Sequence, residues 1–144
     1  MVLLVMTVGG TGVGPTKAHS VPRSPVVPDS IPAACLPPGT VGRASRWAVV
    51  HRGGQVTAVS PRCRHQLADL SKGALDAHGC LGCPWHGSRY DVDTGAMAQG
   101  PRGILGYVGR TPGHTQAVKA YAGLLRLARR TLTRRGDDLV VDAR

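Results

Sequence analysis

The chain has 144 residues, which is enough for one domain with a modest core. It contains no Phe, two Trp and three Tyr, so Val, Leu and Ala must fill that core. Twenty Gly and eleven Pro favour loops and strands over helices. The net charge of +10 permits nucleic-acid binding, but the sequence has no nucleic-acid motif and few aromatic rings for base stacking. We therefore predict no nucleic-acid partner.

The first part of the chain, residues 1–29, has the composition of a flexible arm. Its apolar start, Met1–Val8, is too short to cross a bilayer and lacks the charged start and cleavage site of a secretory signal. The glycine-rich run Gly9–Gly14 does not match the dinucleotide fingerprint, because the third glycine would fall on Pro15. We predict a flexible arm, an ordered domain over residues 30–144 and a cytoplasmic location.

The first strong strand signal is a hairpin. Two β-rich runs, Ser45–Arg52 and Gln55–Ser60, are joined by Gly53-Gly54, a two-residue turn that tolerates positive φ. The second run leads directly into Cys63, so the hairpin positions the residues that follow it.

Two short ligand boxes come next, C-x-H at Cys63–His65 and C-P-W-H at Cys83–His86, with seventeen residues between them. Thiolates suit iron–sulfur clusters, copper(I) or zinc, and imidazoles suit zinc, copper or iron. The mixed set leaves two candidates, a zinc site or a 2Fe-2S cluster in which two His replace two Cys on one iron. Structural zinc boxes usually pair like with like, whereas each box here mixes the two types, and this favours the cluster.

This signature resembles that of the Rieske family. The match continues beyond the boxes, through Gly87, Ser88, Tyr90, Asp91, Thr94-Gly95 and Gly100-Pro101. The resemblance implies that Cys63 and Cys83 bind a buried iron. It also implies that His65 and His86 bind the outer iron, which accepts the electron, and that the free nitrogens of both rings face solvent.

The resemblance also assigns two hydroxyl groups to the cofactor. In the high-potential Rieske proteins of cytochrome bc complexes, the residues at the positions of Ser88 and Tyr90 hydrogen-bond to sulfur, and we predict the same role here. Those proteins have an inter-loop disulfide, whose positions are Ala68 and Trp85 in this chain. A further departure is Leu67, where the family usually has Gly.

Two cysteines lie outside the boxes. Cys80 is three residues before Cys83 and makes a C-x-x-C that can recruit zinc, but the strand pattern of Gly79–Gly82 favours a buried small hydrophobe. Cys35 lies in a proline-rich approach with no partner indicated by the sequence. A disulfide between Cys35 and Cys80 stays open.

Further pairs of short β-rich runs with turns between them are Ala74-Leu75 with Cys80-Leu81, Arg89–Val92 with Ala96–Ala98, and Thr131–Arg134 with Leu139–Asp142. Short strands at this spacing, with Gly-rich turns, predict an all-β fold, a small antiparallel β-sandwich or barrel. This agrees with the fold that the Rieske resemblance implies, with its two cluster-binding loops.

Residues 102–130 form a basic insert relative to small Rieske ferredoxins, which reach the last hairpin by a shorter connection. Within it, Thr115–Arg130 has apolar residues at three- and four-residue spacing and predicts one inserted helix near the C-terminus. We expect Thr115 to cap this helix and its late Arg residues to suit the C-terminal end of the helix dipole. The helix either packs on its own sheet or presents a basic amphipathic surface to a membrane or a protein.

These features predict an electron-transfer protein, the ferredoxin-like component of an oxidoreductase system, with no catalytic residues of its own. A second, mononuclear iron site is not indicated, because the other histidines are scattered: His19, His51, His78 and His114. The alternatives are a zinc-stabilised interaction module, or a non-catalytic subunit of an oxygenase or nitrite-reductase-like enzyme. Because Arg62, Arg64 and Arg89 flank the boxes, we predict a redox partner protein that docks through an acidic surface.

Overall fold

The computed structural model describes residues 29–109 and 111–143. The predicted arm lies outside the described residues except for Asp29, and the proposed boundary at residue 30 stays a prediction. The strands are β1 Ser30–Pro32, β2 Val41–Ala44, β3 Trp47–Arg52, β4 Gln55–Val59, β5 Ala74–Leu75, β6 Leu81–Gly82, β7 Arg89–Tyr90, β8 Met97–Gln99, β9 Gly103–Ile104, β10 Tyr107–Val108, β11 Arg129–Arg135 and β12 Asp138–Val141. The helix α1 spans His114–Leu124, and two 3-10 turns span Ala33–Cys35 and Leu70–Lys72.

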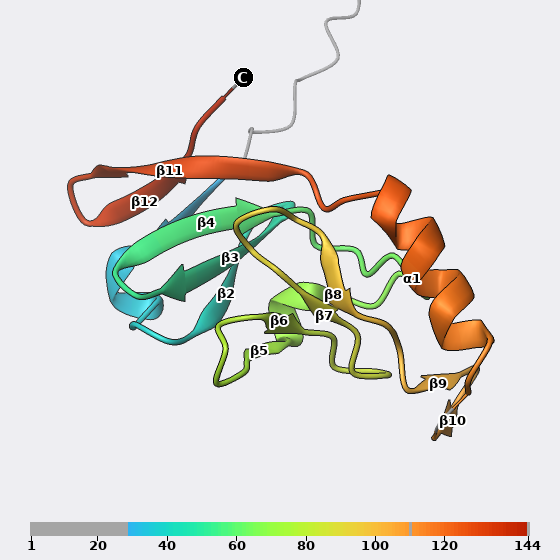
Figure 1. Cartoon of the computed structure of the whole chain (residues 1–144). Helices are drawn as coiled ribbons and strands as arrows, with labels where there is room; N and C mark the ends of the chain where they lie inside the picture. The colour runs from blue at the N-terminus through green and yellow to red at the C-terminus, as the bar shows by residue number, and fades with distance from the viewer. Residues whose placement is uncertain (1–28, 110, 144) are drawn as a thin grey trace, which may run out of the picture.

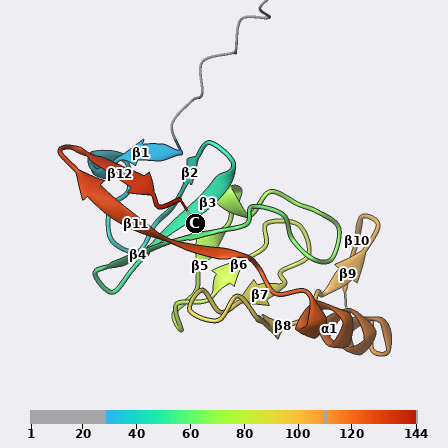
Figure 2. The same cartoon turned by 90° about the horizontal axis from the view of Figure 1, so that it is seen from above.

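The strands form antiparallel sheets, which confirms the predicted fold class. One sheet has the order β1-β12-β11-β4-β3-β2, a second has the order β5-β6-β7-β8, and β9 pairs with β10. Figure 1 shows the large sheet above the four-stranded one, with α1 and the β9–β10 hairpin together at one end of the molecule. Figure 2, seen from above, places β1 and β12 at the opposite end.

The predicted hairpins are present. Arg52 pairs with Gln55 across Gly53-Gly54, and both glycines have positive φ, at 54° and 81°. This is the conformation that a two-residue hairpin turn requires. The pairs β5–β6, β7–β8 and β11–β12 also form, with bounds that differ by at most two residues from the predicted runs.

The core lies on both faces of the large sheet. Ala48 and Val50 of β3 point into one cluster of buried side chains, and Val49 between them points into the other, as alternation along a strand requires. The first cluster also contains Cys63 and Cys83. The two thiols of the ligand boxes are therefore part of the core.

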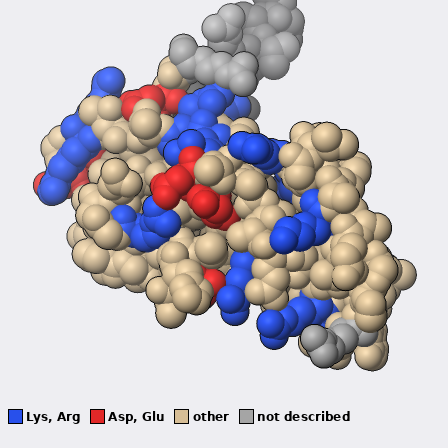
Figure 3. Space-filling model, viewed as in Figure 1, with Lys and Arg blue, Asp and Glu red and all other residues tan. Residues whose placement is uncertain are grey.

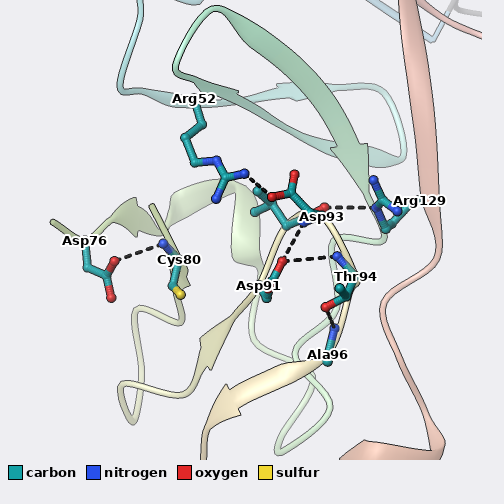
Figure 4. Close-up of polar contacts among 9 residues, drawn as sticks. Arg52, Asp76, Cys80, Asp91, Asp93, Thr94, Ala96 and Arg129 are labelled. Carbon is teal, nitrogen blue, oxygen red and sulfur yellow. Dashed lines mark hydrogen bonds and ion pairs between the residues drawn. The ribbon is translucent and has the colours of Figure 1, made fainter. Parts of the chain in front are cut away.

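The two larger sheets are joined at the turn between β7 and β8 (Figure 4). Asp91 Oδ1 accepts the backbone N–H groups of Asp93 and Thr94, which fixes the turn. Arg52 at the end of β3 forms an ion pair with Asp93, and Arg129 Nε donates to the Val92 carbonyl at 2.9 Å. The large sheet thus holds the end of the strand pair that follows the second ligand box.

The predicted helix is present but shorter than expected. It ends at Leu124, and the predicted continuation to Arg130 is wrong. The physical reason is strand pairing: Leu127 N donates to Gly95 O at 2.8 Å, and Arg129 opens β11 opposite Val59 of β4. The late Arg residues therefore lie in a strand and its approach, not at the end of the helix dipole.

The predicted cap is also wrong. The residue before the helix is Gly113, with no side-chain cap, and Thr115 lies inside the first turn, where its hydroxyl donates to Pro101 O and Thr111 O. Within α1, Lys119 is the one Lys or Arg residue, so the helix is not a strongly basic surface. No helix among the described residues combines the length and the apolar character needed to cross a membrane.

Candidate metal centre

The two ligand boxes lie on loops with the same backbone hydrogen bonds. In loop one, Cys63–Ala68, the N–H of Cys63 donates to Ala68 O at 2.9 Å. In loop two, Cys83–Ser88, the N–H of Cys83 donates to Ser88 O at 2.7 Å. Loop one connects β4 to β5 and loop two connects β6 to β7, so each loop is anchored by strands on both sides.

Each loop closes through a residue with positive φ four positions after its cysteine. In loop two this residue is Gly87, at φ 65°, and its N–H donates to Cys83 O at 3.2 Å. In loop one it is Leu67, at φ 57°, and its N–H donates to Cys63 O at 3.0 Å. Loop one therefore keeps the expected path although Leu replaces the glycine that this conformation favours.

The loops bring the two thiols together below the two imidazoles. Cys63 and Cys83 are buried, at 1% and 6% exposure, and the rings of His65 and His86 lie 5.1 Å apart between centroids. A hydrogen bond between the thiols lowers the pKa of Cys63 and raises the pKa of Cys83. Burial, with the nearby imidazoles, lowers the pKa of His65 and favours the neutral ring that a metal requires.

Of the two predicted hydroxyl groups, that of Tyr90 lies beside a thiol of the site. The Tyr90 oxygen accepts the backbone N–H of Arg64 at 2.8 Å and lies 3.2 Å from Cys63 Sγ. Burial, together with the neighbouring Cys63, raises the pKa of Tyr90, so the phenol keeps the proton that it can donate to sulfur. Ser88 is fully buried, and its Oγ has no hydrogen-bond partner.

The unpartnered atoms show that the site fits a further group. Buried polar atoms are normally hydrogen-bonded, yet Ser88 Oγ and His86 Nδ1 are buried with no partner. A hydroxyl donor and a ring nitrogen are the groups that a cluster sulfur and an iron would engage. The residues present therefore fit a 2Fe-2S cluster.

A single metal ion fits this arrangement less well. Within residues 29–109 and 111–143, no three His, Cys or acidic side chains are grouped so that they could hold one ion. A structural zinc ion takes four ligands, whereas each iron of a two-iron cluster takes two from the protein. Cys80, the possible additional zinc ligand, is a free, partly buried thiol just before β6, and Cys35 is free and exposed.

The expected exposure of the free histidine nitrogens is wrong for His65, whose Nε2 is buried without a partner. His86 is only 6% exposed as a residue. The insert is the reason: the N–H of Arg102 donates to His86 O at 2.7 Å, next to β9, and α1 lies over His65.

Two residues of this shell were missed by sequence reasoning. His114, the first residue of α1, lies with its ring 5.2 Å from that of His65. Arg64, predicted from the sequence to contribute to docking, instead has its guanidinium on the carbonyl oxygens of Leu125 and Arg126, both at 3.0 Å. Arg64 lies between Cys63 and His65 in the C-x-H box, and this position was a possible signal of its contact with the site. No local pattern indicates that His114 contacts His65.

The model of the family described as "Rieske [2Fe-2S] domain" matches residues 31–104, which include both loops. The chain belongs to this family. The Rieske domain is similar to "Ferredoxin CarAc" of Metapseudomonas resinovorans, with 38% identity over 74 residues, which are 48% of this chain and 68% of the relative.

Solved structures of other proteins share this fold. A chain of the "Complex of reduced oxygenase and oxidized ferredoxin in carbazole 1,9a-dioxygenase" is 26% identical, with a TM-score of 0.54 over 77% of this chain and 96% of that chain. The ferredoxin of carbazole 1,9a-dioxygenase from Nocardioides aromaticivorans IC177 shares the fold, with 24% identity and a TM-score of 0.52 over 81% of this chain and 96% of that one. This Rieske protein carries a 2Fe-2S cluster and transfers electrons.

Proposed function

We propose that Cys63 and Cys83 bind one iron of the cluster and that His65 and His86 bind the other. The observation that supports this most directly is the arrangement of the four side chains, two thiols buried in the same core cluster and an imidazole pair with ring centroids 5.1 Å apart. The cluster, when bound, takes up and releases one electron.

The surrounding side chains set how readily that electron is taken up. The Tyr90 hydroxyl lies beside Cys63 Sγ, and Ser88 Oγ is a buried donor without a partner. In this proposal both donate to sulfur, and donors near sulfur stabilise the more negative, reduced state. Tyr90 is held in place by the N–H of Arg64, so its hydroxyl direction is fixed before any electron arrives. Water has little access to the thiol side, because both thiols, Ser88 and Tyr90 are buried.

The proposed partner is a redox protein, the oxygenase or the reductase of an oxygenase system. The support is the similarity to ferredoxins of carbazole 1,9a-dioxygenase, one of which is described in complex with its oxygenase. The chain itself is the electron carrier in this proposal.

The proposed contact surface is a groove of about 710 Å³ beside His86. Its lining includes Trp85, Leu105 and Val108, which are exposed, and contains no charged side chain. A partner that covers it therefore presents apolar side chains at the centre of the contact, as protein interfaces commonly do.

The charges around the groove support an acidic rim on the partner. Arg102 and Arg126 are exposed next to the ligand loops, and Lys and Arg are spread over the face in Figure 3. All three arginines that flank the boxes contact other groups of the chain: Arg64 donates to Leu125 O, and Arg89 pairs with Asp76. Arg62 donates to Leu67 O at 3.3 Å.

Metal and sulfide analysis tests the cofactor and its ligands together. Anaerobically purified protein is expected to be brown and to contain iron and acid-labile sulfide in equal amounts. The iron should be lost when the Cys and His of either ligand box are replaced. Stoichiometric zinc without sulfide in a colourless protein would overturn the proposal.

The partner proposal predicts a moderate dependence of the reduction rate on salt. Between low salt and about 0.5 M the Debye length falls to a few ångströms, so the rate should fall as the charged rim is screened. A reduction rate that does not change with salt would contradict the acidic rim on the partner. A reduction rate unchanged by Trp85→Ala would contradict the groove as the contact surface.

A further inference from the structure

The insert places a third imidazole against the candidate ligand of loop one. The His114 ring meets the His65 ring with centroids 5.2 Å apart and planes at 63°, almost the same separation as between His65 and His86. His114 opens α1, outside the run that matches the Rieske signature.

Each of these two rings has a buried nitrogen without a hydrogen-bond partner. His65 Nε2 and His114 Nδ1 are buried, and neither makes a hydrogen bond. An unsatisfied buried polar atom costs about 1–3 kcal/mol, so two such atoms on neighbouring rings are not expected to stay apart. The last torsion of a histidine side chain is broad, and ring rotation can bring the two nitrogens into a hydrogen bond.

The start of α1 has little freedom to move away. The Thr115 hydroxyl donates to Pro101 O at 2.8 Å and to Thr111 O at 3.0 Å. The backbone of Thr115 also packs on Gly100, where an added Cβ would lie 2.8 Å from Thr115 O. His114 is therefore held by contacts that do not involve its own side chain.

The end of α1 is attached to loop one itself. Arg64, between the two candidate ligands of that loop, donates to Leu125 O and Arg126 O, both at 3.0 Å. Ala122 is buried in the core cluster that also contains Cys63, and Val118 packs against it. Loop one and α1 therefore form one packed unit, with His114 above His65.

We propose that His114 is a positioning residue for His65. With His65 bound to iron through Nδ1, its Nε2–H donates to His114 Nδ1, and His114 keeps its own proton on Nε2. Such a partner on the outer nitrogen fixes the ring orientation of a metal-bound histidine and raises its basicity. This inference rests on the proposed ligand assignment.

Two variants separate the hydrogen bond from simple packing. His114→Leu keeps an apolar cover but removes the acceptor, whereas His114→Gln keeps an acceptor at a similar reach. A less basic ligand stabilises the ferric state less, so His114→Leu is expected to raise the midpoint potential, and His114→Gln to restore the wild-type value. His78→Leu, at an exposed turn histidine, is the control.

Equal potentials in wild type and both variants would overturn the proposal, because His114 would then be a packing residue only. A potential shifted equally in Leu and Gln variants would overturn it as well, since an acceptor would not restore the value. If the wild-type protein itself shows no cluster signal, the ligand assignment would be overturned instead. The two failures are therefore distinguishable.

A measurement on the wild-type holoprotein covers the case in which a variant does not fold. Diethyl pyrocarbonate modifies free imidazole nitrogens, and mass spectrometry locates the product. His65 is expected to stay unmodified while the exposed His78 reacts. Rapid modification of His65 in the intact wild-type holoprotein would overturn the proposal.

Discussion

The two ligand loops have the same backbone conformation but lie in different surroundings. Loop one and loop two have the same pair of hydrogen bonds and the same positive-φ residue, although that residue is Leu67 in one and Gly87 in the other. Loop one lies under α1 and contributes only Gln66 to the open groove, whereas loop two lines that groove with Pro84, Trp85 and His86. The comparison shows that strand anchoring determines the loop geometry, and that the insert makes the two histidines different.

Removing a ligand from either loop is expected to have the largest effect. A preformed site rarely exists in the unfolded chain, so the energy of ligand binding becomes folding energy. Cys63→Ser and His86→Ala should each lose the cluster and unfold most of the domain, a loss on the order of the 5 kcal/mol or more that keeps a small domain folded. Iron content and circular dichroism measure both effects.

The control for the ligand variants is Cys80→Ser, which changes a partly buried thiol outside the loops. It should keep both cluster and fold. Recovery of a stable apo protein with native-like circular dichroism from Cys63→Ser would show that the strands fold the loops without the cluster.

The hydroxyl groups on the two loops provide the next comparison. Tyr90→Phe removes the donor near Cys63 Sγ, and Ser88→Ala removes the unpartnered hydroxyl of loop two. A net loss of about 1 kcal/mol per hydrogen bond corresponds to roughly 40 mV for one electron, so each variant should lower the midpoint potential by about that amount. Protein-film voltammetry measures the shift.

Tyr121→Phe, at an exposed tyrosine of α1, is the matched control and should leave the potential unchanged. If Tyr90→Phe and Ser88→Ala both keep the wild-type midpoint with the cluster intact, these hydroxyls do not reach the cluster sulfurs.

Substitutions at the positive-φ position of each loop test backbone strain. Leu67 is 63% exposed and has φ 57°, a backbone conformation that costs an L-residue about 1–2 kcal/mol. Replacement by glycine recovers only part of this energy, because glycine makes the unfolded chain more flexible. Leu67→Gly should therefore stabilise the domain by about 0.5–1 kcal/mol, and Gly87→Ala should destabilise it by a similar amount. Chemical denaturation measures both, and equal signs for the two variants would contradict the comparison.

The smallest expected effect is the acid response of the turn before loop two. Backbone hydrogen bonds from Cys80 and His78 lower the pKa of Asp76, which also pairs with Arg89 at 3.2 Å. A carboxyl with a depressed folded pKa contributes stability that is present above its unfolded pKa of about 3.9 and is lost as the pH falls through the folded value.

Asp76→Asn should therefore lose less stability than wild type when the pH falls from about 5 to about 3. Urea midpoints across this range measure the difference, with Asp138→Asn in β12 as the control. A steeper acid loss in Asp76→Asn than in wild type has the opposite sign and would contradict this account.

Much of the site follows from local sequence, because a turn or ligand box is encoded by adjacent residues. Gly53-Gly54 predicted the β3–β4 turn, and the two boxes predicted the loops that carry the four candidate ligand side chains. The helix end was wrong because the pairing of Arg129 with Val59 of β4 overrides helical periodicity. Such pairing depends on residues far apart in the chain.

The remaining features depend on tertiary contacts. The β9–β10 hairpin turns at Leu105-Gly106, both with positive φ, and leucine gives no signal for such a turn. The cover over His65 needs α1 to fold back on loop one, and this is specified by Arg64 and Thr115 acting on backbone carbonyls. A side chain that bonds to a distant carbonyl leaves no residue-type pattern at its partner.

The most direct test of the central claim is pulsed EPR of the reduced protein. Ligation by two thiolates and two imidazoles predicts a rhombic signal with couplings to two inequivalent histidine nitrogens. His65→Ala and His86→Ala should each abolish that signal. A reduced signal without nitrogen coupling, or an EPR-silent protein that contains zinc, would contradict the assignment of Cys63, His65, Cys83 and His86.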